Sequence, residues 1–141
     1  VEWSGDVPRS SGLAGSTALL TATLGALRAL TESGPTGTGE FAEFVRDVER
    51  RDAGIVCGYQ DAHMTVRGGL RLLDFAGKHP DTDGGPLPNA ARESWETGRP
   101  LPFLLVTTGV RRLSGAVHAP VIDRWRAGDP FVRSAIAEIG D

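Results

Sequence analysis

Small residues and hydroxyl side chains gather in one stretch near the start of the sequence, Pro8–Ala18, which reads Pro-Arg-Ser-Ser-Gly-Leu-Ala-Gly-Ser-Thr-Ala. An Ala- and Leu-rich run follows, and its apolar spacing predicts a helix from Ser16 to about Thr31. Glycine lets the backbone approach a ligand closely, and the first turn of a helix presents unpaired N–H groups with a partial positive charge. Such a loop suits a phosphate, whose oxygens can also accept hydrogen bonds from the hydroxyls of Ser16 and Thr17.

This stretch also has a simpler interpretation. A Gly-rich turn that ends in a serine N-cap is a common way to begin a helix. The stretch is not a Walker A loop, because the lysine that follows the last glycine of that motif is absent. Taken alone, the loop predicts either a phosphate site or only a helix cap.

Two carboxylates further along the chain are the other candidates for chemistry. Glu49 falls toward the end of a second predicted helix, Gly39–Arg51, and Asp61 follows a turn-rich segment, Gly54–Gly58. The turn can bring Asp61 back toward Glu49. Each residue also has a simpler explanation: Asp61 opens a short helical segment, as an N-cap would, and Glu49 lies in a charged run where solvated ion pairs are usual.

The rest of the chain is predicted to contain short strands and helices joined by Gly- and Pro-rich loops. We expect strands at Val1–Trp3, Leu70–Phe75 and Leu101–Thr107, the last of them buried because its run is continuously apolar. The remaining expected elements are a short helix through Val66, a loop over Gly77–Pro100 with a helical turn near Ala90–Trp95, and helices over Val117–Arg126 and Pro130–Ile139. This mixture indicates an α+β or α/β fold.

The bulk composition is that of an ordinary globular domain, with 141 residues of which 40% are hydrophobic and 23% charged. A net charge of -3, with basic residues scattered among acids, argues against a nucleic-acid partner. No apolar run approaches the ~20 residues needed to span a membrane. The single cysteine, Cys57, and the lack of a visible signal peptide favour a cytoplasmic location. The chain starts without Met, and we expect it to be truncated at both ends.

Four blocks of the sequence resemble the GHMP kinases, a family that includes galactokinase, homoserine kinase and mevalonate kinase, and the blocks follow the family's order. The first, Pro8-x-x-x-Gly12-Leu13-x-x-Ser16-Thr17-Ala18, resembles the family's glycine-serine ATP loop, although Thr17 stands where serine is usual. The other blocks are Glu49 with Gly54–Asp61, then Gly68–Leu70 with Asp74–Phe75, and finally Ser114–His118 with Arg124–Phe131. The last two blocks are similar to glucuronokinase-like members.

The resemblance implies an α+β fold of the GHMP N-terminal-domain type, which is ribosomal protein S5 domain 2-like. It implies that residues 1–141 form part of an ATP-binding N-terminal domain and reach the start of the C-terminal domain near residues 130–141. The implied activity is transfer of a phosphoryl group from ATP, with Mg²⁺, to a sugar hydroxyl. Two family motifs are missing from these residues, the N-terminal strand-loop that helps bind the sugar and the C-terminal glycine-rich loop. We therefore expect the isolated chain to be inactive.

The resemblance also assigns roles to residues. Asp61 is the expected catalytic carboxylate near the sugar hydroxyl, and Glu49 with Thr17 or Ser16 is the expected Mg²⁺ ligand set. The expected ATP- and phosphate-binding residues are Gly12, Leu13, Ala14, Gly15, Ser16 and Thr17. The family's small-molecule substrate is a sugar; which sugar and which hydroxyl, the oligomeric state, and the roles of Ser114 and His118 are left open.

Two other functions remain as alternatives: a non-catalytic nucleotide-binding relative, and a structural α+β domain whose Gly-Ser loop only caps a helix. Other reactive residue types carry weaker signals. Cys57 has no paired His motif around it and is interpreted as a small buried residue in a tight turn. The three histidines, His63, His79 and His118, are too dispersed for a zinc site.

Overall fold

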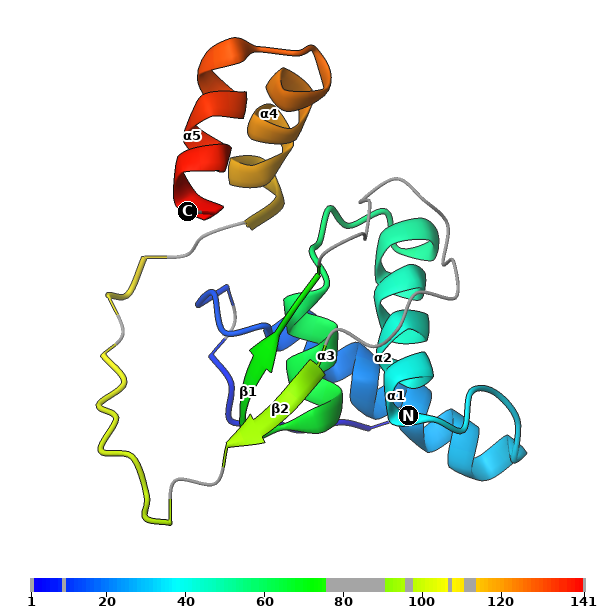
Figure 1. The fold of residues 1–141 in the computed structure, drawn as a ribbon. Coiled ribbons are helices and arrows are strands. Elements are labelled where there is room, and N and C mark those ends of the chain that lie inside the picture. Colours follow the sequence, from blue (N-terminus) through cyan, green and yellow to red (C-terminus); the bar gives the residue numbers. More distant parts are fainter. Residues whose placement is uncertain are drawn as a thin grey trace.

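The structure is a computed structural model that describes residues 2–8, 10–75, 91–95, 98–106, 108–110 and 114–140. Its described elements are mainly helical, with one two-stranded sheet (Figure 1). In chain order they are α1 (Gly15–Thr31), α2 (Thr38–Asp47), the π-helix η1 (Val48–Asp52), α3 (Gln60–Arg67), β1 (Leu70–Leu73), β2 (Ala91–Trp95), α4 (Ser114–Arg126) and α5 (Pro130–Gly140).

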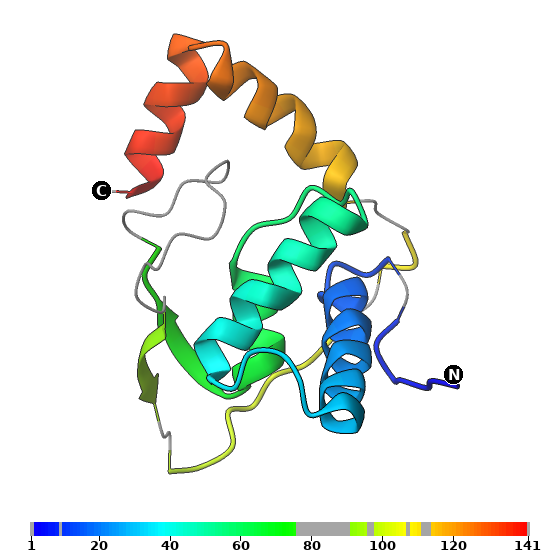
Figure 2. The same ribbon diagram turned by 90° about the vertical axis from the view of Figure 1, so that its right-hand side faces the viewer.

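Three helices, α1, α2 and α3, each pack against the other two (Figure 2). Their shared core is built from the buried side chains of Phe41, Val45 and Ala62. The partly buried residues that pack against this core are Leu20, Leu24 and Val66. The hydroxyls of Thr21 and Thr65, 3.0 Å apart, join α1 to α3 beside the core. The apolar faces of these amphipathic helices therefore meet at the core, although Leu27 and Leu30 of α1 stay exposed.

The loop before α1 has the conformation that its glycines permit. Ser10 has φ 55°, Gly12 has φ +77° and Ala14, the residue that precedes the helix, has φ 53°, so the backbone turns through the left-handed region three times. The expected loop into a helix that begins near Ser16 is confirmed, with the helix starting at Gly15. No side-chain hydrogen bond caps α1. The serine N-cap interpretation is therefore wrong.

The second helix changes type before it ends. The predicted helix over Gly39–Arg51 is confirmed as α2 followed directly by the π-helix η1. The wider turn is closed by the N–H of Ala53, which donates to the carbonyl oxygen of Val48 at 3.0 Å. Single π-helical turns of this kind are often found at functional sites. Glu49 lies in this turn.

The two-stranded sheet confirms the predicted strand that begins at Leu70 and corrects the helical turn predicted near Ala90–Trp95. The predicted strand over Leu70–Phe75 is observed as β1, and the predicted helix through Val66 as α3. β1 pairs antiparallel with β2, with Leu70 opposite Trp95. The helical turn expected near Ala90–Trp95 is therefore wrong, because pairing with β1 overrides the weak local preference of this segment. Residues 76–90, most of the predicted loop, lie outside the described part of the chain.

The buried strand predicted over Leu101–Thr107 is also wrong over its described residues, 101–106. This segment belongs to no strand, and Phe103 and Leu104 are 85% and 88% exposed. An apolar run becomes a buried strand only where neighbouring strands supply hydrogen-bond partners, and the two-stranded sheet pairs β1 only with β2. Glu2 and Trp3 likewise lie in no strand, contrary to the prediction for Val1–Trp3.

The two predicted C-terminal helices are observed as α4 and α5, and they contact each other (Figure 1). The side chain of Asp129 caps the start of α5, because its Oδ1 accepts a hydrogen bond from the N–H of Phe131 at 3.0 Å. Its Oδ2 accepts another from Nε of Arg124 at 2.8 Å, and this bond is the main cause that lowers the pKa of Asp129. Within the described residues, no helix is both long enough and apolar enough to cross a membrane.

Candidate functional site

Ser16, Thr17 and Glu49 come together where α1 begins. The hydroxyl of Ser16 donates to Oε1 of Glu49 at 3.0 Å, and the hydroxyl of Thr17 lies 3.0 Å from Oε1 and 2.8 Å from Oε2. Thr17 is 2% exposed and Glu49 3% exposed, whereas Ser16 is open to solvent. Glu49 therefore does not belong to a solvated charged face, and that simpler explanation of this residue is wrong.

The local structure explains why these three residues meet. Ser16 and Thr17 lie in the first turn of α1, and Glu49 lies in η1, which extends a helix packed along α1. The π-helical turn also binds the chain that follows, because the N–H of Ile55 donates to the carbonyl oxygen of Glu49 at 3.0 Å. The change of helix type thus falls on the residue that faces the beginning of α1.

These residues fit a hard cation. Two hydroxyl oxygens and a carboxylate converge, and Mg²⁺ prefers oxygen ligands, usually one or two carboxylates together with substrate phosphates. A hydroxyl that now donates to Glu49 keeps lone pairs for a cation, and the exposure of Ser16 leaves one side open to solvent. Across the described part of the chain, no group of three or more His, Cys, Asp or Glu side chains gathers. A cation here would need the hydroxyls.

The phosphate-binding residues predicted from the sequence form one continuous segment of the chain, in which Thr17 is buried. Gly12, Leu13 and Ala14 lie in the loop, while Gly15, Ser16 and Thr17 make the first turn of α1. The hydroxyl of Ser11 donates to the carbonyl oxygen of Pro8 at 2.7 Å and closes the loop on itself. The first N–H groups of the helix have no partner within the helix, so they are oriented toward any anion held by this loop.

Asp61 takes no part in the hydrogen bonds of this site. It is in the first turn of α3, half-buried, and the residue that caps α3 is Tyr59. Asp61 is therefore not the N-cap of its helix. Burial raises the pKa of the Cys57 thiol most, and the charges of Glu49 and Asp61 raise this pKa further. The hydrogen bonds among Ser16, Thr17 and Glu49 do not include Asp61.

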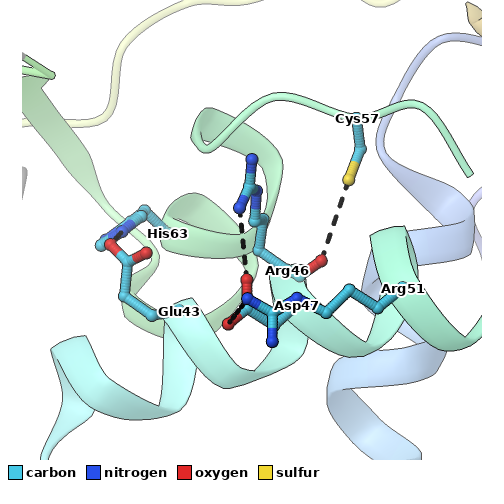
Figure 3. A network of polar contacts seen from close by, with 6 residues as sticks. All are labelled: Glu43, Arg46, Asp47, Arg51, Cys57 and His63. Carbon is cyan, nitrogen blue, oxygen red and sulfur yellow. Dashed lines mark hydrogen bonds and ion pairs between the residues drawn. The ribbon is translucent and has the colours of Figure 1, made fainter. Parts of the chain in front are cut away.

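Cys57 is half-buried, whereas the sequence suggested a small buried residue in a tight turn. Burial, followed by the negative charge of Glu49, raises the pKa of its thiol to about 11. Its Sγ lies 4.0 Å from the carbonyl oxygen of Arg46 (Figure 3). At neutral pH the thiol stays protonated, which makes it a poor nucleophile.

Sequence reasoning missed a buried polar network between α2 and the beginning of α3. Arg46 is buried, its guanidinium lies 4.1 Å from the centre of the Tyr59 ring, and its Nη1 lies 3.2 Å from Oδ1 of Asp47 (Figure 3). Fully buried His63 places Nε2 3.0 Å from Oε1 of Glu43. Because charged residues on a helix are usually solvated, no pattern in the sequence marked Arg46 as buried. The network fixes α2 against the beginning of α3.

Comparisons with known proteins match this chain to a kinase family and to several sugar kinases. Residues 1–69 match the family model described as GHMP kinases N terminal domain. The chain is 30% identical over 135 residues to Glucuronokinase 1 of Arabidopsis thaliana, covering 96% of this chain and 36% of that protein. It is 31% identical over 135 residues to Probable glucuronokinase 2 of the same plant, covering 95% of this chain and 36% of that protein.

A bacterial relative matches a shorter part of the chain. The D-glycero-alpha-D-manno-heptose 7-phosphate kinase of Campylobacter jejuni subsp. jejuni is 39% identical over 72 residues, covering 50% of this chain and 20% of that protein. No solved structure gives a significant match.

The chain spans about a third of the length of the glucuronokinases that it matches. The family match ends at residue 69, so the assignment of the remaining residues to the same domain, and the S5 domain 2-like architecture, stay predictions. All residues of the candidate site, from Gly12 to Asp61, fall inside the matched segment. Residues 1–69 of this chain therefore belong to the GHMP kinase N-terminal domain family.

Proposed function

We propose that the protein is an ATP-dependent sugar kinase that transfers the γ-phosphoryl group of ATP to a sugar hydroxyl. The observation that carries the proposal is the buried Glu49 carboxylate held by the hydroxyls of Ser16 and Thr17 behind a glycine-rich loop. Two of the relatives support the class of sugar kinases, because one is named a glucuronokinase and the other a heptose 7-phosphate kinase. Because the chain spans about a third of the glucuronokinases, the activity is proposed for the full-length protein.

Phosphoryl transfer needs positioned reactants and neutralised phosphate oxygens, and little other chemistry from the protein. In this proposal the loop and first helical turn, Gly12–Thr17, hold the phosphates of ATP through backbone N–H groups. Glu49, Thr17 and Ser16 hold Mg²⁺, which when bound offsets charge on the phosphate oxygens. Asp61 orients the sugar hydroxyl and accepts its proton.

The proposal is tested by a coupled ADP-release assay on the full-length protein with ATP, Mg²⁺ and a panel of sugars that includes glucuronate and a heptose 7-phosphate. We expect ADP release that depends on the presence of one of these sugars. ATP binding without sugar-dependent ADP release would instead identify a non-catalytic nucleotide-binding relative. The absence of any effect of ATP on thermal unfolding would identify a purely structural domain.

A further inference from the structure

The continuous helical segment formed by α2 and η1 contacts two other helices through polar side chains placed three residues apart. Glu43 contacts His63 of α3, and Arg46 contacts Tyr59 at the start of α3. Glu49 accepts hydrogen bonds from the first turn of α1. The segment that carries the proposed metal-binding carboxylate therefore also holds the beginning of α3.

The contact between Glu43 and His63 is buried on the side of α3. His63 is 0% exposed, and its Nε2 lies 3.0 Å from Oε1 of Glu43 (Figure 3). An ionised carboxylate only accepts hydrogen bonds, so His63 donates to it through Nε2. A hydrogen bond has a preferred distance and direction, and in a buried site it weakens when either partner shifts. This contact therefore fixes the place of His63 against α2.

The contact between Arg46 and Tyr59 lies one helical turn away. Arg46 is 2% exposed, and its guanidinium lies 4.1 Å from the centre of the Tyr59 ring. The carbonyl oxygen of Tyr59 accepts a hydrogen bond from the N–H of His63 at 3.2 Å, which closes the first turn of α3. Both ends of this turn are thus held by side chains of α2.

Asp61 lies midway between the two held residues, in the first turn of α3. Its backbone belongs to the turn that runs from Tyr59 to His63. A tilt or a slide of this turn against α2 would move the Asp61 carboxylate with it. The two contacts therefore set the place of Asp61 relative to α2, and so relative to Glu49 in the same helical segment.

The apolar core between the same helices does not define this position by itself. Phe41, Val45 and Ala62 hold the helices together, but the hydrophobic effect is non-directional. Apolar residues of similar volume can often replace buried charged groups without loss of stability, and the best-attested use of such groups is to select one arrangement. The polar contacts of Glu43 and Arg46 beside this core therefore indicate a positioning role.

We propose that Glu43 and Arg46 are positioning residues that set the place of the Asp61 carboxylate for phosphoryl transfer. They act through their partners on α3 and contact neither the substrate nor the metal. The inference rests on the proposed function. Phosphoryl transfer depends on positioning, and a displacement of about 1 Å can lower a rate about 10²-fold. Loss of either contact should therefore lower kcat more than it changes ATP binding.

The kinetic test is steady-state ADP release by the full-length protein. His63→Leu removes the donor to Glu43, so we expect kcat to fall about tenfold or more while KM for ATP changes less than about threefold. His63→Gln keeps an N–H donor and should recover most of the lost kcat. The control is Thr65→Val, which removes from the same helix a part-buried contact to Thr21 of α1. The control should keep kcat near that of wild type.

Hydrogen exchange gives a second readout that needs no turnover. Mass spectrometry follows the amides in the first turn of α3, among them the N–H of His63. We expect His63→Leu to accelerate exchange in this turn about tenfold or more, and Arg46→Met to act in the same way at the second contact. The amides of α1 should change no more than they do in Thr65→Val.

Unchanged kcat and unchanged exchange in His63→Leu and Arg46→Met would overturn the inference. Equal losses of kcat in His63→Leu, His63→Gln and Thr65→Val would also overturn it, because they would indicate a general loss of stability. Faster exchange confined to the first turn of α3, in a protein that releases no ADP with any sugar, would contradict the kinase and support the anchoring of α3. Sugar-dependent ADP release with a normal kcat in His63→Leu would support the kinase and contradict the inference.

Discussion

Glu49 shows how far a residue's surroundings can differ from its sequence neighbourhood. It lies in the run Arg46-Asp47-Val48-Glu49-Arg50-Arg51-Asp52, which is typical of a solvated helix face. In the structure its carboxylate is buried and accepts hydrogen bonds from the hydroxyls of Ser16 and Thr17. The resemblance to a kinase family predicted that Glu49 would face Ser16 and Thr17. Composition and periodicity did not, because they carry no signal for a π-helical turn.

Asp61 is the residue on which the proposed transfer depends most. Asp61→Asn keeps the size of the side chain and removes its ability to accept a proton, so we expect turnover to fall by about 10²-fold or more. The affinity for ATP should change little, because Asp61 takes no part in the hydrogen bonds of Ser16, Thr17 and Glu49. Steady-state kinetics of the full-length protein measure both quantities. The control is Asp52→Asn, which makes the same change at an exposed position. Near-normal turnover in Asp61→Asn would contradict a catalytic role for Asp61.

The pH dependence of Cys57 tests the charge around the same turn. Because the thiolate is the reactive form, alkylation of the folded 141-residue chain should be slow at pH 8 and should accelerate until the pH reaches about 11. In urea the same thiol should titrate near its ordinary value of 9.0. The folded state favours the neutral thiol, so its contribution to stability is present below pH 9 and is lost as the pH rises toward 11. Iodoacetamide labelling followed by mass spectrometry measures the rate, and a plateau already near the ordinary value would contradict the burial of this thiol.

At the scale of elements, the helices were predictable and the extended segments were less so. The apolar spacing in α1, α2 and α3 is local, and each helix can be recognised without its neighbours. Ala91–Trp95 becomes a strand only because β1 lies beside it, and Leu101–Val106 lacks such a partner among the described residues. Pairing between distant segments is what a single sequence does not reveal.

A stack of side chains fixes the beginning of α3 and with it the position of Asp61. The guanidinium of Arg46 lies 4.1 Å from the centre of the Tyr59 ring, and the Phe75 ring stacks on Tyr59 with the two ring centres 5.5 Å apart. Tyr59→Ala should lower the free energy of unfolding by about 1–3 kcal/mol, less than the 3–5 kcal/mol typical of fully buried aromatic residues. Urea unfolding of the full-length protein measures it. Tyr59→Phe keeps the ring and should stay within about 1 kcal/mol of wild type, so equal effects of the two substitutions would contradict the stack.

At the scale of the molecule, the described part of the chain leaves apolar surface uncovered. Phe103, Leu104, Leu105 and Val106 are all more than half exposed in one continuous run. Exposed apolar segments of this kind favour association. The family match covers residues 1–69, and the glucuronokinases that the chain matches are nearly three times as long.

The isolated 141-residue chain should therefore associate in solution and should lack sugar-dependent kinase activity. Transfer depends on complete positioning of both reactants, and a partly built site loses most of that advantage. Light scattering after size-exclusion chromatography measures association, and the coupled ADP-release assay measures activity. Sugar-dependent ADP release well above that of an Asp61→Asn chain would show that these residues are sufficient.

In the proposed kinase, Ser16, Thr17 and Glu49 hold the Mg²⁺ of bound ATP, and the other proposed roles depend on this. The most direct measurement is calorimetric binding of ATP to the full-length protein with and without Mg²⁺, for wild type, Glu49→Gln and the control Glu40→Gln, whose residue is exposed at the start of α2. Substitution of a residue that only hydrogen-bonds to a metal ligand already lowers the metal affinity about 10–100-fold. We therefore predict that Mg²⁺ strengthens ATP binding in wild type and in Glu40→Gln, and that Glu49→Gln loses at least about tenfold of this effect. An equal gain from Mg²⁺ in all three proteins would contradict the assignment.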